Sequence, residues 1–152
     1  MAQGWLLSWG IVAVSVDRSA LRASESEKIT INLGYIDLGQ IDLLVRDGFY
    51  SNRTDLIRTA IRNQLERHAD VLTQSTKRRR LELGLRHYNR DELEALRAAG
   101  SHVDIAVLGL ARIAADVSPE LARATIASVV VLGALQASPA VRAALSDRTA
   151  AL

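Results

Sequence analysis

The sequence predicts a mainly α-helical chain with short strands, made of a dimeric unit at residues 28–75 and a small α/β region at residues 81–148. Three observations lead to this fold class. A single short stretch alternates polar and apolar residues, and two helical patterns follow it with no second strand nearby. Apolar, strand-like runs separated by helix-start signals return only after residue 80.

The alternating stretch spans residues 28–33 and reads KITINL. In an extended strand its apolar residues share one face, while Lys28, Thr30 and Asn32 share the other. A lone strand leaves its backbone hydrogen-bonding groups without partners. The simplest remedy is a second copy of the chain, with the two strands paired antiparallel about a two-fold axis. The sequence therefore predicts an obligate homodimer.

Two helices are expected after this strand. The first carries apolar residues at helical spacing from Leu38 to Val45 and ends at Gly48, a residue suited to the left-handed position after a helix. The second begins at Asn52, with Asp55 placed to complete a capping box. Its apolar pattern fades at residues 74–76, where we expect the helix to end.

These features together resemble the ribbon-helix-helix (MetJ/Arc/CopG-like) family of DNA-binding proteins. The resemblance rests on the KITINL strand, the glycine between the helices, and the run Asn52-Arg53-Thr54-Asp55-Leu56-Ile57-Arg58. It implies a transcriptional regulator whose two-stranded ribbon enters the major groove of double-stranded DNA. It also implies that the start of the second helix clamps the DNA backbone on each side of the ribbon.

The candidate base-reading residues are Lys28, Thr30 and Asn32. Asparagine can pair with adenine through two hydrogen bonds, lysine can donate to guanine, and threonine offers a hydroxyl and a methyl group. On an isolated strand these residues would simply form the solvent face. A two-fold ribbon with an exposed polar face favours DNA contact instead.

The candidate phosphate-binding residues are Asn52, Arg53 and Thr54. They lie at a helix start, where free backbone N–H groups and the helix dipole favour an anion. Asn52 can also act only as a helix cap, and the two roles are compatible because capping uses the side chain. Residues 77–80, KRRR, are either a further phosphate-contacting patch or the solvated face of a basic linker at residues 76–80.

Composition restricts the classes of partner and site. The formal net charge is only +2, so a DNA-binding surface must gather its positive residues locally. The chain has no cysteine, which fits a cytoplasmic location and removes thiolate metal sites. No apolar run is long enough to span a bilayer. We expect residues 1–27 to be a disordered apolar leader followed by a polar linker.

Neither a metal site nor an active site is expected. The three histidines, His68, His87 and His102, are far apart in sequence and have no cysteine to join them. No arrangement of a nucleophile with a base occurs, and no glycine-rich phosphate loop follows a strand. The sequence therefore predicts a protein that is not an enzyme and needs no cofactor.

The region at residues 81–148 is expected to alternate strands and helices. A half-buried strand at residues 81–86 is followed by a helix from Asn89, a strand at 103–110, a helix from Ser118 to Ile126, a strand at 128–132 and a last helix from Ser138. Val107-Leu108-Gly109 recurs as Val131-Leu132-Gly133, which suggests a small duplication. The strands are apolar enough to be buried on both faces, so the region either packs on itself or pairs with the partner subunit's copy.

These expectations favour a repressor that acts by occluding its operator, as a dimer or as a higher oligomer on DNA. One alternative is an antitoxin that regulates its own operon, although such proteins need a charged, disordered tail. Another alternative is a self-assembling or partner-binding protein that works through residues 81–148, which serve oligomerisation or regulation in either case.

Overall fold

The computed structural model of the chain describes residues 26–150. Six α-helices and a three-stranded parallel sheet follow a segment without regular structure at residues 26–34. The predicted combination of helices and strands is confirmed, but the strands are not all short, since β2 and β3 have 11 residues each. Within residues 26–150, no helix combines the length and the apolarity that crossing a membrane requires.

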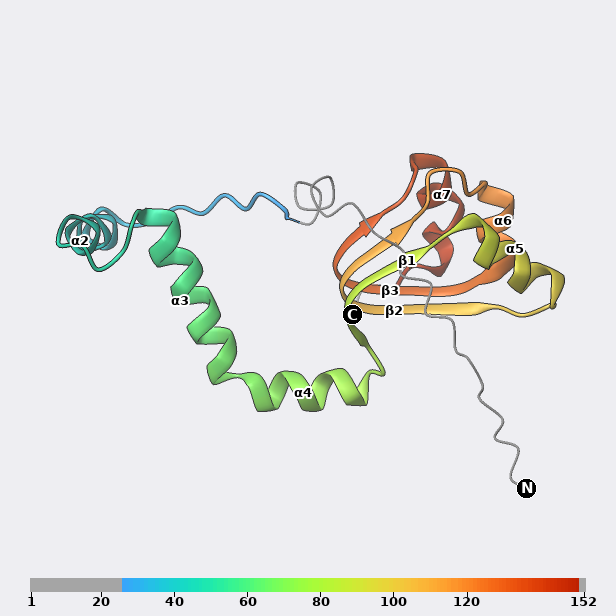
Figure 1. The fold of residues 1–152 in the computed structure, drawn as a ribbon, viewed down its shortest axis with the longest axis horizontal. Coiled ribbons are helices and arrows are strands. Elements are labelled where there is room, and N and C mark those ends of the chain that lie inside the picture. Colours follow the sequence, from blue (N-terminus) through green and yellow to red (C-terminus); the bar gives the residue numbers. More distant parts are fainter. Residues whose placement is uncertain (1–25, 151–152) are drawn as a thin grey trace, which may run out of the picture.

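Three helices form an arm that reaches away from the rest of the chain (Figure 1). They are α2 (Tyr35–Arg46), α3 (Arg53–Arg67) and α4 (Ala69–Arg78). Gly48 takes up a positive φ of 81° after α2, and Asn52 caps α3, so both helix boundaries predicted here are confirmed. The predicted strand at residues 28–33 lies in the irregular segment, and its pairing with a second copy stays a prediction.

The predicted end of the second helix at residues 74–76 is wrong. The chain bends at His68 and continues as α4 to Arg78. The hydroxyl of Thr76 donates to the carbonyl of Leu72 at 2.7 Å, one helical turn earlier. The fading apolar pattern therefore marks an exposed helix rather than its end, and the basic run begins inside its last turn.

The remaining elements form an α/β unit in which strand and helix alternate, as the sequence predicts. The elements are β1 (Glu82–Tyr88), α5 (Arg90–Ala98), β2 (Val103–Ile113), α6 (Pro119–Thr125), β3 (Ile126–Gln136), α7 (Pro139–Ala144) and the 3-10 helix η1 (Ser146–Arg148). Each α-helix of this unit starts at a side-chain cap. Asn89, Ser118 and Ser138 accept the backbone N–H of Glu92, Leu121 and Val141 at 2.8, 3.2 and 3.3 Å. Ile126, expected in a helix, is instead the first residue of β3.

The strands pair in the order β1-β2-β3, and their repeated motifs lie side by side. Leu108 and Gly109 of β2 pair with Leu132 and Gly133 of β3, so the duplication seen in sequence is a repeat in register. Gly84 of β1 pairs with Gly109, so Leu83-Gly84 is a third copy of the Leu-Gly part of this motif. This copy was not identified from the sequence. All three glycines have φ between 120° and 139°, a range that side chains disfavour.

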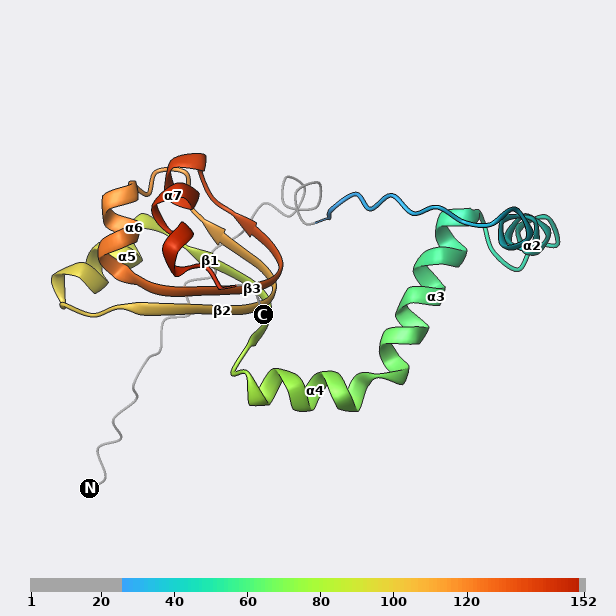
Figure 2. The ribbon, with the colours of Figure 1, turned by 180° about the vertical axis from the view of Figure 1, so that it is seen from behind.

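The core lies within the α/β unit, on one face of the sheet. Its fully buried side chains include Leu93 of α5, Ile105 and Val107 of β2, Val129 of β3 and Val141 of α7. Figures 1 and 2 show α5 and α6 side by side at one end of the unit, and α7 packs on α6. These helices cover only one face of the sheet, so in the single chain the strands are not buried on both faces, and pairing with the partner subunit's copy stays a prediction.

The expectation of a half-buried β1 is also wrong. Only Tyr88 of this strand is buried, whereas Leu83 is 81% exposed and Leu85 is 45% exposed. β1 is the first strand of the sheet, so a single neighbouring strand and no helix cover these two leucines. Their alternation with polar residues predicts the strand correctly but not what packs against it.

Candidate nucleic-acid interface

The predicted base-reading residues lie in the irregular segment that leads into α2. Lys28, Thr30 and Asn32 are all exposed to solvent. The intervening Ile29 and Ile31 are also exposed, at 79% and 55%. In the single chain the apolar side of this segment therefore has no cover from any described residue.

The helical arm shares this exposure, because α2, α3 and α4 contain no buried residue. Large apolar side chains of the arm and of the segment before it are more than 40% exposed. They include Ile29, Ile31, Leu33, Ile36, Leu43, Phe49, Ile61 and Leu65. So much exposed apolar surface on an ordered helix pair is typical of an interface that another chain covers.

The start of α3 is closed by a variant of the capping box, in which Asp55 bonds to the residue before the cap. The side-chain oxygen of Asn52 accepts the backbone N–H of Asp55 at 2.9 Å, and the Asp55 carboxylate accepts the N–H of Ser51 at 3.1 Å. The capping role expected for Asn52 is confirmed. Among residues 26–150, no partner accepts the backbone N–H groups of Arg53 and Thr54, so they are available to an anion.

The side chain of Arg53 lies against α2 rather than standing free. Its Nε and Nη2 donate to the two carboxylate oxygens of Asp42, each at 2.6 Å. The Arg53 guanidinium holds the pKa of Asp42 below its usual value, chiefly through this hydrogen bond. The contribution of the pair to stability is thus present above the unfolded-state pKa of aspartate and is lost as the pH falls through the folded-state pKa.

Asp42 is a residue that sequence reasoning missed. It lies on α2, and its partner lies on the far side of the turn between the helices. Pairs within one helix can be found from their spacing, but this pair depends on the angle between two helices. With Nε and Nη2 engaged, Arg53 keeps Nη1 as a donor for a further acceptor.

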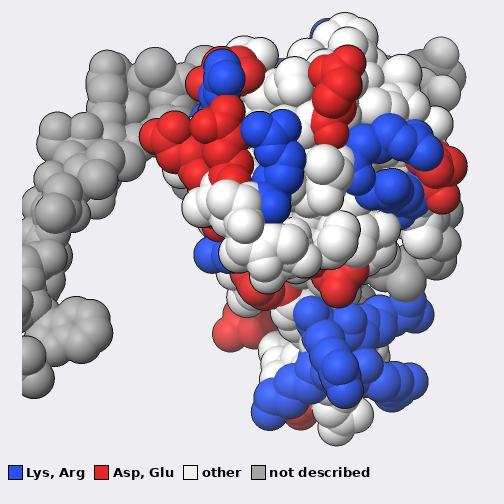
Figure 3. Space-filling model, turned by 90° about the vertical axis from the view of Figure 1, so that its right-hand side faces the viewer, with Lys and Arg blue, Asp and Glu red and all other residues white. Residues whose placement is uncertain are grey.

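The basic run occupies the end of the arm. Lys77 and Arg78 form the last turn of α4, and Arg79 and Arg80 follow it, all four exposed. No ion pair within the described part of the chain involves them. Figure 3 shows lysine and arginine side chains gathered at the lower end of one face, below a region where acidic and basic groups are mixed.

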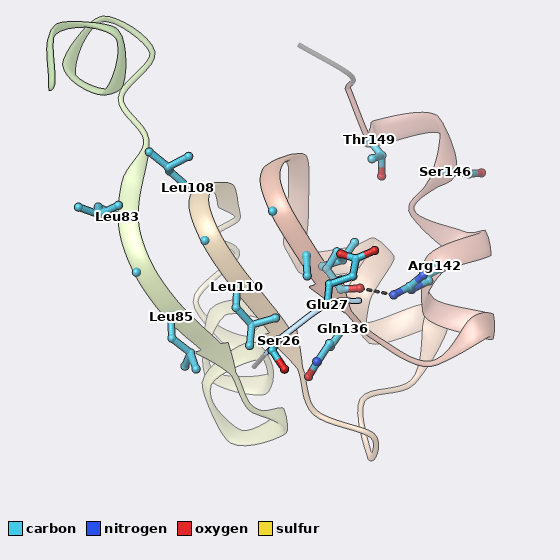
Figure 4. A pocket seen from close by; sticks show the side chains of 15 residues that line it. Ser26, Glu27, Leu83, Leu85, Leu108, Leu110, Gln136, Arg142, Ser146 and Thr149 are labelled. Atoms are coloured by element: carbon cyan, nitrogen blue, oxygen red, sulfur yellow. Dashed lines mark hydrogen bonds between the residues drawn. The ribbon is translucent and has the colours of Figure 1, made fainter. Parts of the chain in front are cut away.

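A hollow on the α/β unit, which Ser26 and Glu27 of the segment before α2 also line, lies apart from the helices of the arm. It is an open groove of about 1180 Å³ along leucines and glycines of the three strands, with Arg142 at one side (Figure 4). Arg142 donates to the carbonyl of Leu135 within it. None of the predicted DNA-binding residues lines this groove. Over the same residues, no three His, Asp or Glu side chains come together in a way that could hold a metal ion.

Comparison with known proteins gives a match to one family. The model of the ribbon-helix-helix transcriptional regulator family matches residues 24–142. This range includes the helical arm and most of the α/β unit. No curated protein and no solved structure matches the chain. The chain therefore belongs to the ribbon-helix-helix transcriptional regulator family.

Proposed function

We propose that the protein is a homodimeric repressor that binds double-stranded DNA in a sequence-specific way and works in the cytoplasm. Family membership supports a role in transcription regulation. The observation that carries the dimer is the arm itself, which has apolar residues along its length and buries none of them. A second copy of residues 28–67 would cover this surface and supply a partner for the strand at residues 28–33.

In this proposal the two strands form an antiparallel ribbon that enters the major groove. Lys28, Thr30 and Asn32 face the bases, because the apolar residues between them turn toward the helices. Repression follows if the bound dimer occludes an operator. The chemistry requires no cofactor or metal, and we propose no catalytic activity.

The start of α3 would hold the DNA backbone on each side of the ribbon. Asn52 orders the first turn, and the backbone N–H groups of Arg53 and Thr54 meet a phosphate. The guanidinium of Arg53, oriented by Asp42, can donate to the same phosphate through Nη1. The carboxylate of Asp55 partly offsets this positive potential, so we expect the contact to position the protein rather than dominate affinity.

The antitoxin alternative is less well supported than the repressor. An antitoxin of this type would end in a charged segment that folds only on its toxin. Here the chain after the arm has its own core, with residues such as Leu93, Ile105 and Val141 fully buried. A role of the α/β unit in self-association is compatible with repression and does not compete with it.

Selection of bound sequences from a random DNA pool is the experiment that tests the proposal. We expect enrichment of a short motif with two-fold symmetry, since each half of the dimer presents the same side chains. The full chain should then protect that motif in footprinting and bind it far more tightly than random DNA at the same salt concentration. Recovery of an unenriched pool would contradict sequence-specific binding.

A further inference from the structure

The two outer edges of the sheet differ in how they are covered. Along β3, the chain after η1 forms a bridge between Val129 and Thr149, and the N–H of Ala150 donates to the carbonyl of Val129 at 3.0 Å. Along β1, no strand of residues 26–150 lies beyond the sheet. β1 is the left-hand strand of Figure 4, where Leu83 and Leu85 project from it. An edge of this kind offers unpaired backbone groups to another strand.

The sequence of this edge is complementary to itself. Residues 82–86 read Glu-Leu-Gly-Leu-Arg, so charge changes sign and apolar residues repeat symmetrically about Gly84. In an antiparallel pair centred on Gly84, Glu82 lies opposite Arg86 of the partner subunit, and Leu83 lies opposite Leu85 of the partner subunit. A parallel pair in the same register would instead set like charges beside each other.

The bend of β1 fits the same symmetry. The side chains of Glu82 and Arg86 lean toward each other across Gly84, with Nε of Arg86 2.8 Å from Oε2 of Glu82. The φ of 120° at Gly84 departs from regular strand geometry, so the strand bends between these two residues. A two-fold axis along the bisector of this bend exchanges the two halves of β1. Each half can then pair with the opposite half of the second copy's β1.

The space beside Gly84 is open, whereas the corresponding space at Gly109 and Gly133 is filled by a neighbouring strand. A Cβ atom at Gly109 would lie 2.2 Å from the carbonyl oxygen of Gly84, and one at Gly133 would lie 2.1 Å from that of Gly109. Each of these positions faces the strand before it, and the backbone of that strand fills the space. At Gly84 the same direction leads outward from the sheet, and no described atom lies within 4 Å of the corresponding position.

We propose that β1 pairs antiparallel with β1 of a second copy of the chain, across a two-fold axis at Gly84. The two sheets then join into one continuous sheet, and Leu83 and Leu85 are covered by each other's copies. The two Glu82 and two Arg86 side chains form a cluster of alternating charge across the axis. This interface is separate from the strand pairing at residues 28–33 and does not require DNA.

Cysteine cross-linking tests the register directly, because the natural chain has no cysteine. The full-length double variant Leu83→Cys with Leu85→Cys places two cysteine pairs face to face across the axis. Mild oxidation should give a disulfide-linked dimer on non-reducing electrophoresis. The single variants are the controls, because each cysteine is then only diagonal to its copy, beyond disulfide reach. Equal cross-linking of single and double variants, or none in either, would overturn the register.

Exchanging charges in the double-cysteine variant tests whether Glu82 lies opposite Arg86 of the partner subunit. Glu82→Arg sets arginine opposite arginine at two places, and Arg86→Glu does the same with glutamate, so each should slow cross-linking about tenfold. The variant carrying both changes restores opposite charges and should cross-link like the parent. Failure of this rescue, when both single changes slow the reaction, would overturn the proposal. The readout is independent of the proposed function because cross-linking is measured without DNA.

Discussion

At the scale of single residues, the polar side of the segment before α2 is where sequence preference should reside. Asn32→Ala or Thr30→Ala should cost about 1–3 kcal/mol on the selected motif, because a good base contact is lost. The salt dependence of binding should hardly change, since neither residue carries charge. Competition between the motif and random DNA over a range of salt concentrations measures both quantities. An equal loss on the two DNAs would assign these residues to the backbone.

Arg53 should behave in the opposite way. Its removal in Arg53→Ala should weaken binding to all sequences alike and lower the salt slope by about one, as expected for the loss of one phosphate contact. Arg90→Ala is a matched control, because Arg90 is likewise exposed and paired with a carboxylate, that of Glu94, but lies on the α/β unit. A change confined to the selected motif would show that Arg53 reads sequence instead.

At the scale of elements, the aligned glycines allow the backbones of neighbouring strands to approach closely at Gly109 and Gly133. Gly109→Ala should destabilise the chain by at least about 2 kcal/mol, since a φ of 139° strains an alanine and its Cβ meets a backbone oxygen. Gly39→Ala is the control, because Gly39 is inside α2 and a Cβ there meets nothing within 4 Å. Alanine at that position should stabilise the helix by up to about 1 kcal/mol. Denaturant unfolding of both variants decides between these outcomes, and equal stabilities would contradict the role given to Gly109.

The elements also show which features of the fold a sequence can predict. Caps such as Asn52, Asn89 and Ser118 were predictable because capping is a local interaction over three residues. The repeated Val-Leu-Gly motif suggested a duplication, and the structure places its two copies in register on neighbouring strands. The strand β1 was predicted, but not as a further copy, because it shares only Leu-Gly with the other two. Burial could not be predicted in the same way. Leu83 and Leu108 are similar in sequence context and paired in the sheet, yet only Leu83 lies at an open edge.

At the candidate site, the cap at Asn52 could be predicted from its spacing to Asp55. The base-reading role of Lys28, Thr30 and Asn32 rests on the alternation of residues 28–33 and stays a prediction. The pairing of Arg53 with Asp42 could not be predicted, because it depends on how α2 and α3 cross. Contacts between elements need the angle between them, which local patterns do not contain.

At the scale of the whole molecule, the arm has no core of its own and should depend on a partner. Ile31→Lys would place a charge between the proposed ribbon and the helices, so dimer and arm structure should be lost together. Analytical ultracentrifugation and far-ultraviolet circular dichroism measure the two effects. Lys28→Ala, on the polar side of the same segment, should leave both unchanged. An Ile31→Lys protein that keeps a helical arm as a monomer would contradict the obligate dimer.

The α/β unit adds a second way in which copies of the chain can associate. A single dimer of this family type reads a short site, so a neighbouring dimer held by the α/β units would raise affinity through effective concentration without new base contacts. Residues 103–136 of this unit have too little positive charge to follow a DNA backbone, since they carry two arginines and no lysine against three acidic residues.

Truncation after Arg80 tests whether the arm binds DNA while the α/β unit links neighbouring dimers. The cut keeps α4 and the basic run intact and removes every strand of the sheet. The shortened chain should bind DNA carrying one copy of the selected motif as the full chain does. On DNA carrying two adjacent copies it should bind more weakly and with less cooperativity. If β1 links the dimers, full-length Glu82→Arg should bind two-site DNA as weakly as the truncated chain does. The full-length variant carrying both Glu82→Arg and Arg86→Glu should bind it like the natural chain. If the full and truncated chains gave identical binding curves on two-site DNA, the α/β units would not link neighbouring dimers. Their association would then be confined to the two subunits of one dimer.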